Sequence, residues 1–207
     1  MHKELQKKLS KTKPPFRKNN IKNNIIVNAI EECIKVLDDD GIIAYPTDTL
    51  YGLGCNAKSL KAIKRINKIK RRKSPISVII NSEKSILNWI NVDTKYNKII
   101  FDKLSSSNTL IIPIKKGFVS DHILGSGQTL GIRIPHHEFC FQITEKYPKP
   151  ITTTSINTTG EKPLTNPNLI KDKFGREIDL IIEDGIIDNK GSKIYLFKQE
   201  GFKLLRS

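Results

Sequence analysis

The segment Gly41–Gly54, with the sequence GIIAYPTDTLYGLG, constrains the fold more than any other part of this 207-residue chain. Its apolar run Ile42–Tyr45 predicts a short buried strand, which Pro46 ends because proline has no N–H to give to a sheet. Three short polar residues, 47–49, follow directly. In α/β proteins, ligands bind just beyond such strand ends. The segment therefore predicts one wall of a binding site, although an ordinary strand–turn–helix connection uses the same residue types.

Two glycines, Gly52 and Gly54, close this segment on either side of Leu53. Glycines at such close spacing let a backbone turn sharply or approach a ligand. We therefore expect a loop across these three residues, continuing the polar segment that follows the strand.

The charge balance points to anionic partners. The chain carries 36 Lys and Arg against 21 Asp and Glu, for a net charge of +15. This excess favours nucleic acid, nucleotide phosphates or an acidic membrane surface. No apolar run approaches the roughly 20 residues that span a bilayer, so we expect no membrane-embedded segment. The three cysteines are widely separated, which predicts neither a disulfide framework nor a metal site and fits a reducing cytoplasm.

The basic residues are concentrated at the N-terminus. Residues 1–24 contain eight Lys or Arg and a single acid, with little to bury. This composition predicts a flexible basic arm. The arm would be a solvated tail, an RNA-contacting segment or a targeting presequence. Residues 25–207 are enough for one domain with its own core.

Helical and strand patterns alternate irregularly along these residues. They predict an α/β or α+β domain in which helices flank a twisted mixed sheet. Helices are expected over residues 25–37, 57–72, 82–89, 96–104, 139–147 and 166–174. Strands are expected over residues 42–45, 76–80, 109–114, 130–134, 150–154, 180–183, 193–197 and 202–205.

Three further features carry candidate chemistry. The run Lys70–Lys73 places four cations in a row, which repel one another unless an anion is near, and Lys with Arg suits phosphates. Arg133 stands in an apolar strand, where a cation is costly unless it is paired or lies on an exposed face. Residues 152–163 form a second polar strand-end segment, TTTSINTTGEKP. Together these features predict a basic cleft that binds a phosphate-bearing ligand.

Four segments, in this order, resemble the motifs of the YrdC-like, threonylcarbamoyl-AMP synthase family. Pro46–Gly54 (PTDTLYGLG) is similar to the family pattern PT[DE]TVYGLG, and Lys70–Arg72 to the Lys-x-Arg that ends the following helix. Leu130–Pro135 (LGIRIP) is similar to VGVRIP, and Thr154–Gly160 (TSINTTG) to TSANxSG. The resemblance covers residues 25–207 and implies a single YrdC-like catalytic domain with a basic concave cleft.

The resemblance implies an enzyme that forms threonylcarbamoyl-AMP and pyrophosphate from L-threonine, bicarbonate or CO₂, and ATP. A downstream threonylcarbamoyl-transferase complex would pass the threonylcarbamoyl group to an adenosine of tRNA. Attack at phosphorus needs positioning and charge neutralisation more than an acid–base pair. Mg²⁺ would accompany ATP and be held mainly by its phosphates, because no carboxylate cluster identifies protein ligands.

The resemblance also implies roles for single residues. Lys70 and Arg72 would be the catalytic pair, holding the ATP phosphates and stabilising the leaving pyrophosphate. Further contacts to ATP are implied for Thr129, Ser155, Asn157 and Arg206. Contacts to L-threonine are implied for Thr49, Arg133, Thr153 and Ser192, with Arg133 pairing with the carboxylate.

The sequence departs from the family pattern in two places. After the helix, residues 70–80 (KRRKSPISVII) stand against KGRPxxNPLxVHI and lack its Asn and its His. Residues 105–113 (SSSNTLIIP) replace a segment that contains WPGPLT. These departures leave open a catalytically reduced module of the same fold that binds double-stranded RNA or tRNA. A carbamoyl-handling hydrolase or transferase with the same pocket is a third hypothesis.

Overall fold

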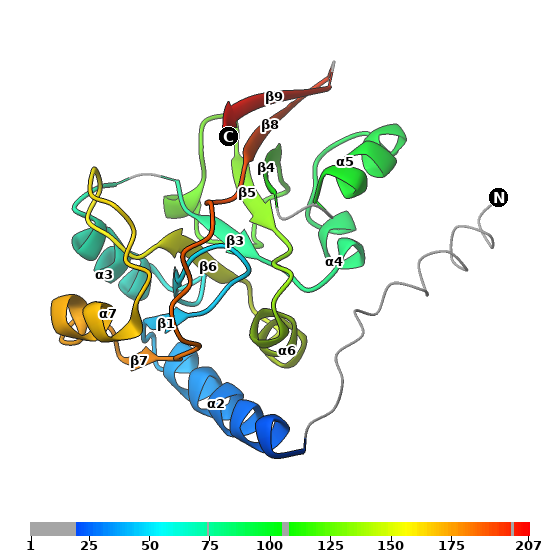
Figure 1. The fold of residues 1–207 in the computed structure, drawn as a ribbon. Helices are drawn as coiled ribbons and strands as arrows, with labels where there is room; N and C mark the ends of the chain where they lie inside the picture. The colour runs from blue at the N-terminus through cyan, green and yellow to red at the C-terminus, as the bar shows by residue number, and fades with distance from the viewer. Residues whose placement is uncertain (1–19, 74, 105–107, 200) are drawn as a thin grey trace.

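The computed structural model describes residues 20–73, 75–104, 108–199 and 201–207, which form the domain in Figure 1. Most of the predicted basic arm lies outside these residues. Helix α2 begins at Asn20, ahead of the expected start at Ile25, and ends at Asp38. Within the described ranges, none of the helices has the length and hydropathy that crossing a membrane requires.

Over the residues that the structure describes, nine strands form one sheet at the centre of the domain, in the order β7-β1-β2-β6-β3-β5-β4-β8-β9. The strands are β1 (Ile43–Tyr45), β2 (Gly52–Gly54), β3 (Ser77–Ile79), β4 (Thr109–Pro113), β5 (Thr129–Arg133), β6 (Ile151–Ser155), β7 (Leu180–Ile181), β8 (Ile194–Lys198) and β9 (Gly201–Arg206). Three pairs are parallel, β1 with β7, β3 with β5 and β4 with β8, and the other five are antiparallel. The sheet is therefore mixed, as the sequence predicted.

Helices cover the two faces of this sheet unequally (Figure 1). They are α2 (Asn20–Asp38), α3 (Leu60–Lys70), α4 (Glu83–Leu87), α5 (Asn97–Leu104), α6 (Glu138–Lys146) and α7 (Pro167–Phe174), with short 3₁₀ turns η1 (Thr94–Tyr96) and η2 (Asp121–Ile123). One face packs against α3, α4, α5 and α7 and forms the larger core. The other face packs against α2 and α6 and forms a smaller core.

The smaller core covers only part of its face. Ile79 of β3 and Ile151 of β6 lie opposite each other and are buried in this core. Two residues away on the same two strands, Ser77 lies opposite Thr153, and both line an open cavity. Residues two apart on a strand point to the same side. One face of the sheet is therefore core at one end and cleft at the other.

The expectation of a loop across Gly52–Gly54 was wrong, because these residues form β2, antiparallel to β1. The glycines are needed for packing rather than for turning. A Cβ on Gly52 would lie 2.9 Å from the ring of Tyr45, and one on Gly54 would lie 2.6 Å from it. Tyr45 is fully buried, so its ring occupies the space that side chains on β2 would need.

Helix α3 positions the first part of the basic run. Ser59 caps it, since its Oγ accepts the N–H of Ala62 at 3.1 Å. Ile66 and Ile69 are among the residues that attach the helix to the larger core. The helix ends where Arg71 adopts a left-handed conformation with φ of 50°. This turn separates the side chains of the basic run from one another.

Candidate active site

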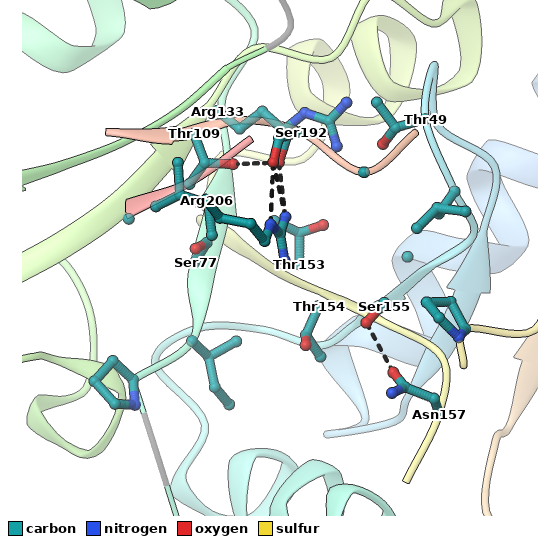
Figure 2. A pocket seen from close by; sticks show the side chains of 18 of the residues that line it. Thr49, Ser77, Thr109, Arg133, Thr153, Thr154, Ser155, Asn157, Ser192 and Arg206 are labelled. Atoms are coloured by element: carbon teal, nitrogen blue, oxygen red, sulfur yellow. Dashed lines mark hydrogen bonds between the residues drawn. The ribbon is translucent and has the colours of Figure 1, made fainter. Parts of the chain in front are cut away.

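The open end of the sheet face is a cleft of about 770 Å³. Its floor consists of small residues on four neighbouring strands, among them Ser77, Thr109, Gly131 and Thr153. Figure 2 shows the side chains of Ser77, Thr109 and Thr153. A Cβ on Gly131 would overlap the Oγ of Ser77. The floor is therefore low because glycine and short polar residues replace the large apolar side chains found under α2 and α6.

The structure brings all ten predicted site residues into this one cleft. They are Thr49, Lys70, Arg72, Thr129, Arg133, Thr153, Ser155, Asn157, Ser192 and Arg206. Among the described residues, the acidic side chain that lines the cleft is Glu161, and it pairs with Lys173 at 2.5 Å. Four basic side chains among the described residues line the cleft, and this excess over acidic side chains favours an anionic ligand.

Lys70 enters the cleft from the end of α3 and is only 3% exposed. Its Nζ donates to the carbonyl of Ser155 at 2.7 Å and to Oδ1 of Asn157 at 2.6 Å. Burial, followed by repulsion from Arg72, lowers the pKa of the Lys70 ammonium to about 8. The amine is therefore held among neutral acceptors, and a negatively charged ligand would favour its protonated form.

The loop after β6 is tied to the same helix end. The Oγ of Ser155 donates to Oδ1 of Asn157 at 2.8 Å (Figure 2). The Asn157 amide donates to the carbonyls of Thr158 and Glu161. Thr159 donates through both its N–H and its Oγ to the carbonyl of Lys70. These bonds fix the loop against the C-terminus of α3, so Lys70 and Asn157 form one wall.

The two arginines after Lys70 occupy different surroundings. Arg72 is partly buried and lines the cleft. Arg71 is exposed and lines a separate groove of about 590 Å³ along α3, which Arg72 also borders. Because of the left-handed turn at Arg71, Lys70 and Arg72 reach the cleft and Arg71 does not.

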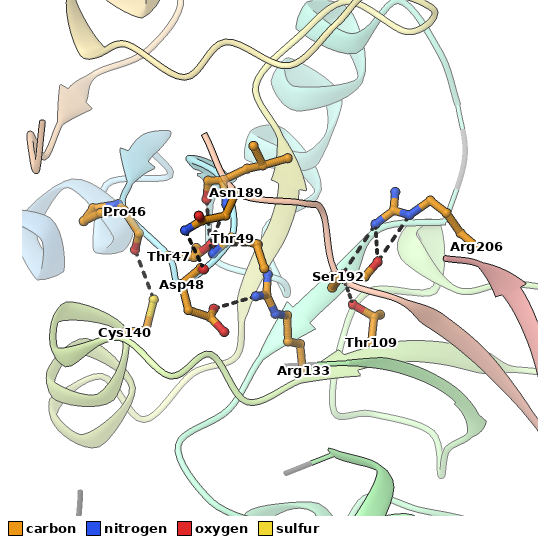
Figure 3. Close-up of polar contacts among 11 residues, drawn as sticks. Pro46, Thr47, Asp48, Thr49, Thr109, Arg133, Cys140, Asn189, Ser192 and Arg206 are labelled. Carbon is orange, nitrogen blue, oxygen red and sulfur yellow. Dashed lines mark hydrogen bonds and ion pairs between the residues drawn. The ribbon is translucent and has the colours of Figure 1, made fainter. Parts of the chain in front are cut away.

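Arg133 reaches the cleft from the end of β5 and forms an ion pair with Asp48. Its Nη2 lies 2.5 Å from Oδ1 of Asp48, and the two side chains are only 6% and 11% exposed (Figure 3). Of the two possibilities left by the sequence, pairing is therefore correct and an exposed face is wrong. Sequence reasoning missed Asp48 as a partner, although it lies within the most specific motif. Its proximity to Arg133 depends on a contact 85 residues apart.

A compact turn places Thr49. The Oγ of Thr47 accepts the N–H groups of Thr49 and Leu50, at 3.1 and 3.2 Å. From the segment before β8, Asn189 donates its N–H to the carbonyl of Thr49 and its side-chain amide to the carbonyl of Asp48, both at 3.2 Å (Figure 3). The turn is therefore fixed from inside and from outside.

Ser192 lies at the end of this same segment and forms a hydroxyl pair with Thr109, at 2.8 Å. Both residues are buried. Arg206 of β9 donates through Nη2 to the carbonyl of Ser192, at 2.8 Å (Figure 2). Sequence reasoning missed Thr109, because its place opposite Arg133 depends on the pairing of β4 with β5, which no residue pattern shows.

Thr129 lies at the start of β5, near the rim of the cleft, where its Oγ donates to the carbonyl of Ser126 at 3.1 Å. Thr153 lies in the floor, between the walls. In the part of the chain that the structure describes, no group of three His, Cys, Asp or Glu side chains could hold a metal ion. The cleft therefore offers hydroxyls and cations as its ligand-binding groups.

Comparisons with known proteins place the chain among its relatives. A family model for Sua5, YciO and YrdC proteins, described as "Telomere recombination", matches residues 35–207. The threonylcarbamoyl-AMP synthase of Buchnera aphidicola subsp. Baizongia pistaciae is 30% identical over 158 residues, covering 74% of this chain and 84% of that protein.

Two solved structures share the fold. Escherichia coli YciO superposes with a TM-score of 0.79 at 23% identity, covering 87% of this chain and 89% of that one. Sua5 of P. abyssi, solved with L-threonine, gives a TM-score of 0.77 at 26% identity, covering 86% of this chain and 53% of that one. The expected family is thus confirmed: the chain belongs to the Sua5/YciO/YrdC family.

Proposed function

We propose that this chain is a threonylcarbamoyl-AMP synthase, which makes threonylcarbamoyl-AMP and pyrophosphate from L-threonine, bicarbonate or CO₂, and ATP. The observation that carries the proposal is the meeting of two cationic groups in one cleft: Lys70 with Arg72 at one side, and Arg133 at another. The related synthase from Buchnera and the threonine-bound P. abyssi protein support this function.

The amino acid would bind at the side of the cleft where Arg133, Thr49 and Ser192 lie (Figure 2). The guanidinium would pair with the threonine carboxylate, because a planar fork of N–H donors matches a carboxylate. The hydroxyls of Thr49, Thr153 and Ser192 would bind its remaining polar groups. A buried cation beside neutral hydroxyls suits an α-amino acid better than a second phosphate group.

The nucleotide would bind with its phosphates against Lys70 and Arg72. Thr129, Ser155, Asn157 and Arg206 are the proposed further contacts to ATP, and all line the same cleft. The amine of threonine, once carboxylated, presents a carboxylate oxygen to the α-phosphorus, and the bond from that phosphorus to the pyrophosphate breaks. Lys70 and Arg72 would neutralise the charge that develops on the leaving pyrophosphate.

Mg²⁺ would enter with ATP. Of the described residues that line the cleft, Glu161 is the acidic one, and Lys173 already binds it. The residues present therefore fit an ion that is held by phosphate oxygens and water rather than by a protein carboxylate cage. The protein's own contribution is to hold the phosphates in line for displacement.

The product is a mixed anhydride of a carbamic and a phosphoric acid, which water would hydrolyse. We propose that a downstream threonylcarbamoyl-transferase complex takes it up in the cytoplasm for the modification of tRNA. Direct contact with tRNA or double-stranded RNA is a further possibility that the net charge of +15 favours.

The decisive experiment is an assay of the purified chain with ATP, Mg²⁺, L-threonine and labelled bicarbonate. We expect pyrophosphate release that requires threonine, together with label in an adenylate. Reactions without threonine, or with D-threonine, serve as controls. Release that does not depend on threonine would contradict the proposal, and tight RNA binding without release would favour the RNA-binding alternative.

A further inference from the structure

We propose that Asp48 is a positioning residue for substrate recognition: its carboxylate holds the Arg133 guanidinium in the orientation that receives the substrate's carboxylate. The inference rests on the proposed function and deepens it, because it names a residue outside the cleft lining that sets affinity for the amino acid. Asp48 acts through Arg133 and makes no contact with the substrate itself.

Asp48 and Arg133 differ in their positions relative to the cleft. Arg133 lines the cleft, whereas Asp48 is absent from the described residues that line it. The carboxylate therefore approaches the guanidinium from the side away from the substrate space, at 2.5 Å from Nη2 (Figure 3). A guanidinium has five N–H donors in a fixed plane. A bond to one terminal nitrogen fixes the plane and leaves other donors for a ligand.

The ion pair between Arg133 and Asp48 is largely shielded from solvent. Arg133 is 5% exposed, and its Nε is buried and forms no hydrogen bond to the described residues. A cation in such surroundings is unfavourable unless a charge compensates it. Without Asp48, the Arg133 side chain would lower its free energy by turning toward solvent. The ion pair therefore keeps the cation buried at the cleft, ready for an incoming carboxylate.

Hydrogen bonds hold Asp48 and its turn in place. Its turn is held by the Oγ of Thr47, and its carbonyl by the side-chain amide of Asn189. Three residues beyond Asn189, Ser192 lines the cleft near Arg133. The same backbone segment thus fixes Asp48 and a proposed threonine contact. Because Asp48 is held in place, the Arg133 guanidinium that it binds is preorganised for a ligand.

The test compares Asp48→Asn with Asp48→Glu in the threonine-dependent release assay. We expect Asp48→Asn to raise KM for threonine by about 10-fold or more, as loss of a buried charge partner would, while KM for ATP stays within about 2-fold. Asp48→Glu, which restores the charge, should recover most of the affinity. Asp184→Asn is the matched control, because Asp184 is exposed and pairs with His137.

A second measurement separates positioning from folding. Threonine binding to the unmodified and variant proteins is titrated by calorimetry, alongside thermal unfolding. A merely structural role would lower Tm and the active fraction, and leave KM and Kd for threonine unchanged; this result would overturn the proposal. If the unmodified protein released no pyrophosphate with threonine, the proposed function itself would fail, whatever Asp48→Asn does.

A double-mutant cycle with Arg133→Met, which removes the cation, completes the test. If Asp48 acts through Arg133, the two substitutions share one effect, and the double variant should be scarcely weaker than Arg133→Met alone. Fully additive losses in threonine affinity would show that Asp48 acts by another route and would also overturn the inference.

Discussion

The ammonium of Lys70 lies 2.6 Å from the side-chain oxygen of Asn157, so the end of α3 meets the loop after β6 inside the cleft. This arrangement buries a cation among neutral acceptors. Burial and the nearby Arg72 lower its pKa to about 8, so the proton that the proposed phosphate contact needs is lost at mildly alkaline pH.

The first prediction concerns pH. Because only the protonated amine attracts phosphate, kcat/KM for ATP should fall as pH rises through about 8. A bound triphosphate favours the charged form, so ATP binding between about pH 8 and 9 should take up a proton. Calorimetry in two buffers with different ionisation enthalpies measures that uptake.

The variant Lys70→Arg is the control for this prediction. Its guanidinium stays charged across the range, so the fall near pH 8 should disappear even if total activity is lower. A profile that is flat between pH 7 and 9.5 in the unmodified protein would show that the Lys70 amine does not titrate there.

The second prediction separates two neighbouring arginines. Arg72→Ala removes a cation that lines the cleft and should lower kcat/KM for ATP by roughly 10²-fold, as loss of one charge-stabilising group does elsewhere. Arg71→Ala removes a cation outside the cleft lining and should change it by less than about 2-fold. Equal losses in the two variants would mean that net charge, rather than position, governs ATP turnover. Circular dichroism checks that both fold.

The third prediction concerns the cleft floor. Gly131→Ala would place a methyl group against Ser77, and overpacking of this kind costs about 1–3 kcal/mol in the free energy of unfolding. KM for threonine should also rise, because the floor must shift. Adding Ser77→Gly removes the overlapping atoms and should restore stability in urea unfolding. A double variant no better than Gly131→Ala would place the strain elsewhere.

The fourth prediction uses the cysteines as probes of folding. All three thiols are buried, and burial raises the pKa values of Cys33 and Cys55 to about 12. Since the thiolate is the reactive form, Ellman's reagent at pH 8 should label them only as the domain unfolds. Their labelling should follow the loss of circular dichroism in urea. Rapid labelling of one thiol in the native protein would reveal local opening around it.

Much of the site could be predicted because its chemistry is local in the sequence. The polar turn at residues 47–49, the cations at 70 and 72 and the loop at 155–157 each follow an element that residue patterns identify. The resemblance then related these segments to one another. The ten predicted side chains, from Thr49 to Arg206, do line one cleft. Their individual roles stay predictions.

What could not be predicted depends on pairing between distant segments. The partner of Arg133 is 85 residues away, and that of Thr109 is 83 residues away. No residue pattern states which strand lies beside which. Strand β2 was missed for another reason: glycine is a poor strand former by propensity, and the space that the Tyr45 ring occupies explains its presence.

The departure from the family pattern after Arg72 also has a structural explanation. In the aligned pattern, Ile79 stands where the family has His. Ile79 lies beside Arg133 in register, but it is 1% exposed and belongs to the core under α2 and α6. An apolar residue therefore fits its surroundings here, and the proposed contacts to threonine are the other residues around Arg133.

The sheet face that is half core and half cleft has a mechanical consequence. One end of β3 and one end of β6 form part of the cleft floor. The other ends of these two strands, at Ile79 and Ile151, are packed in the smaller core. A displacement of the floor would have to shear that core, which close packing resists. Adjustment to successive ligands is therefore expected in the side chains at the rim of the cleft rather than in the strands, which hold the floor in place.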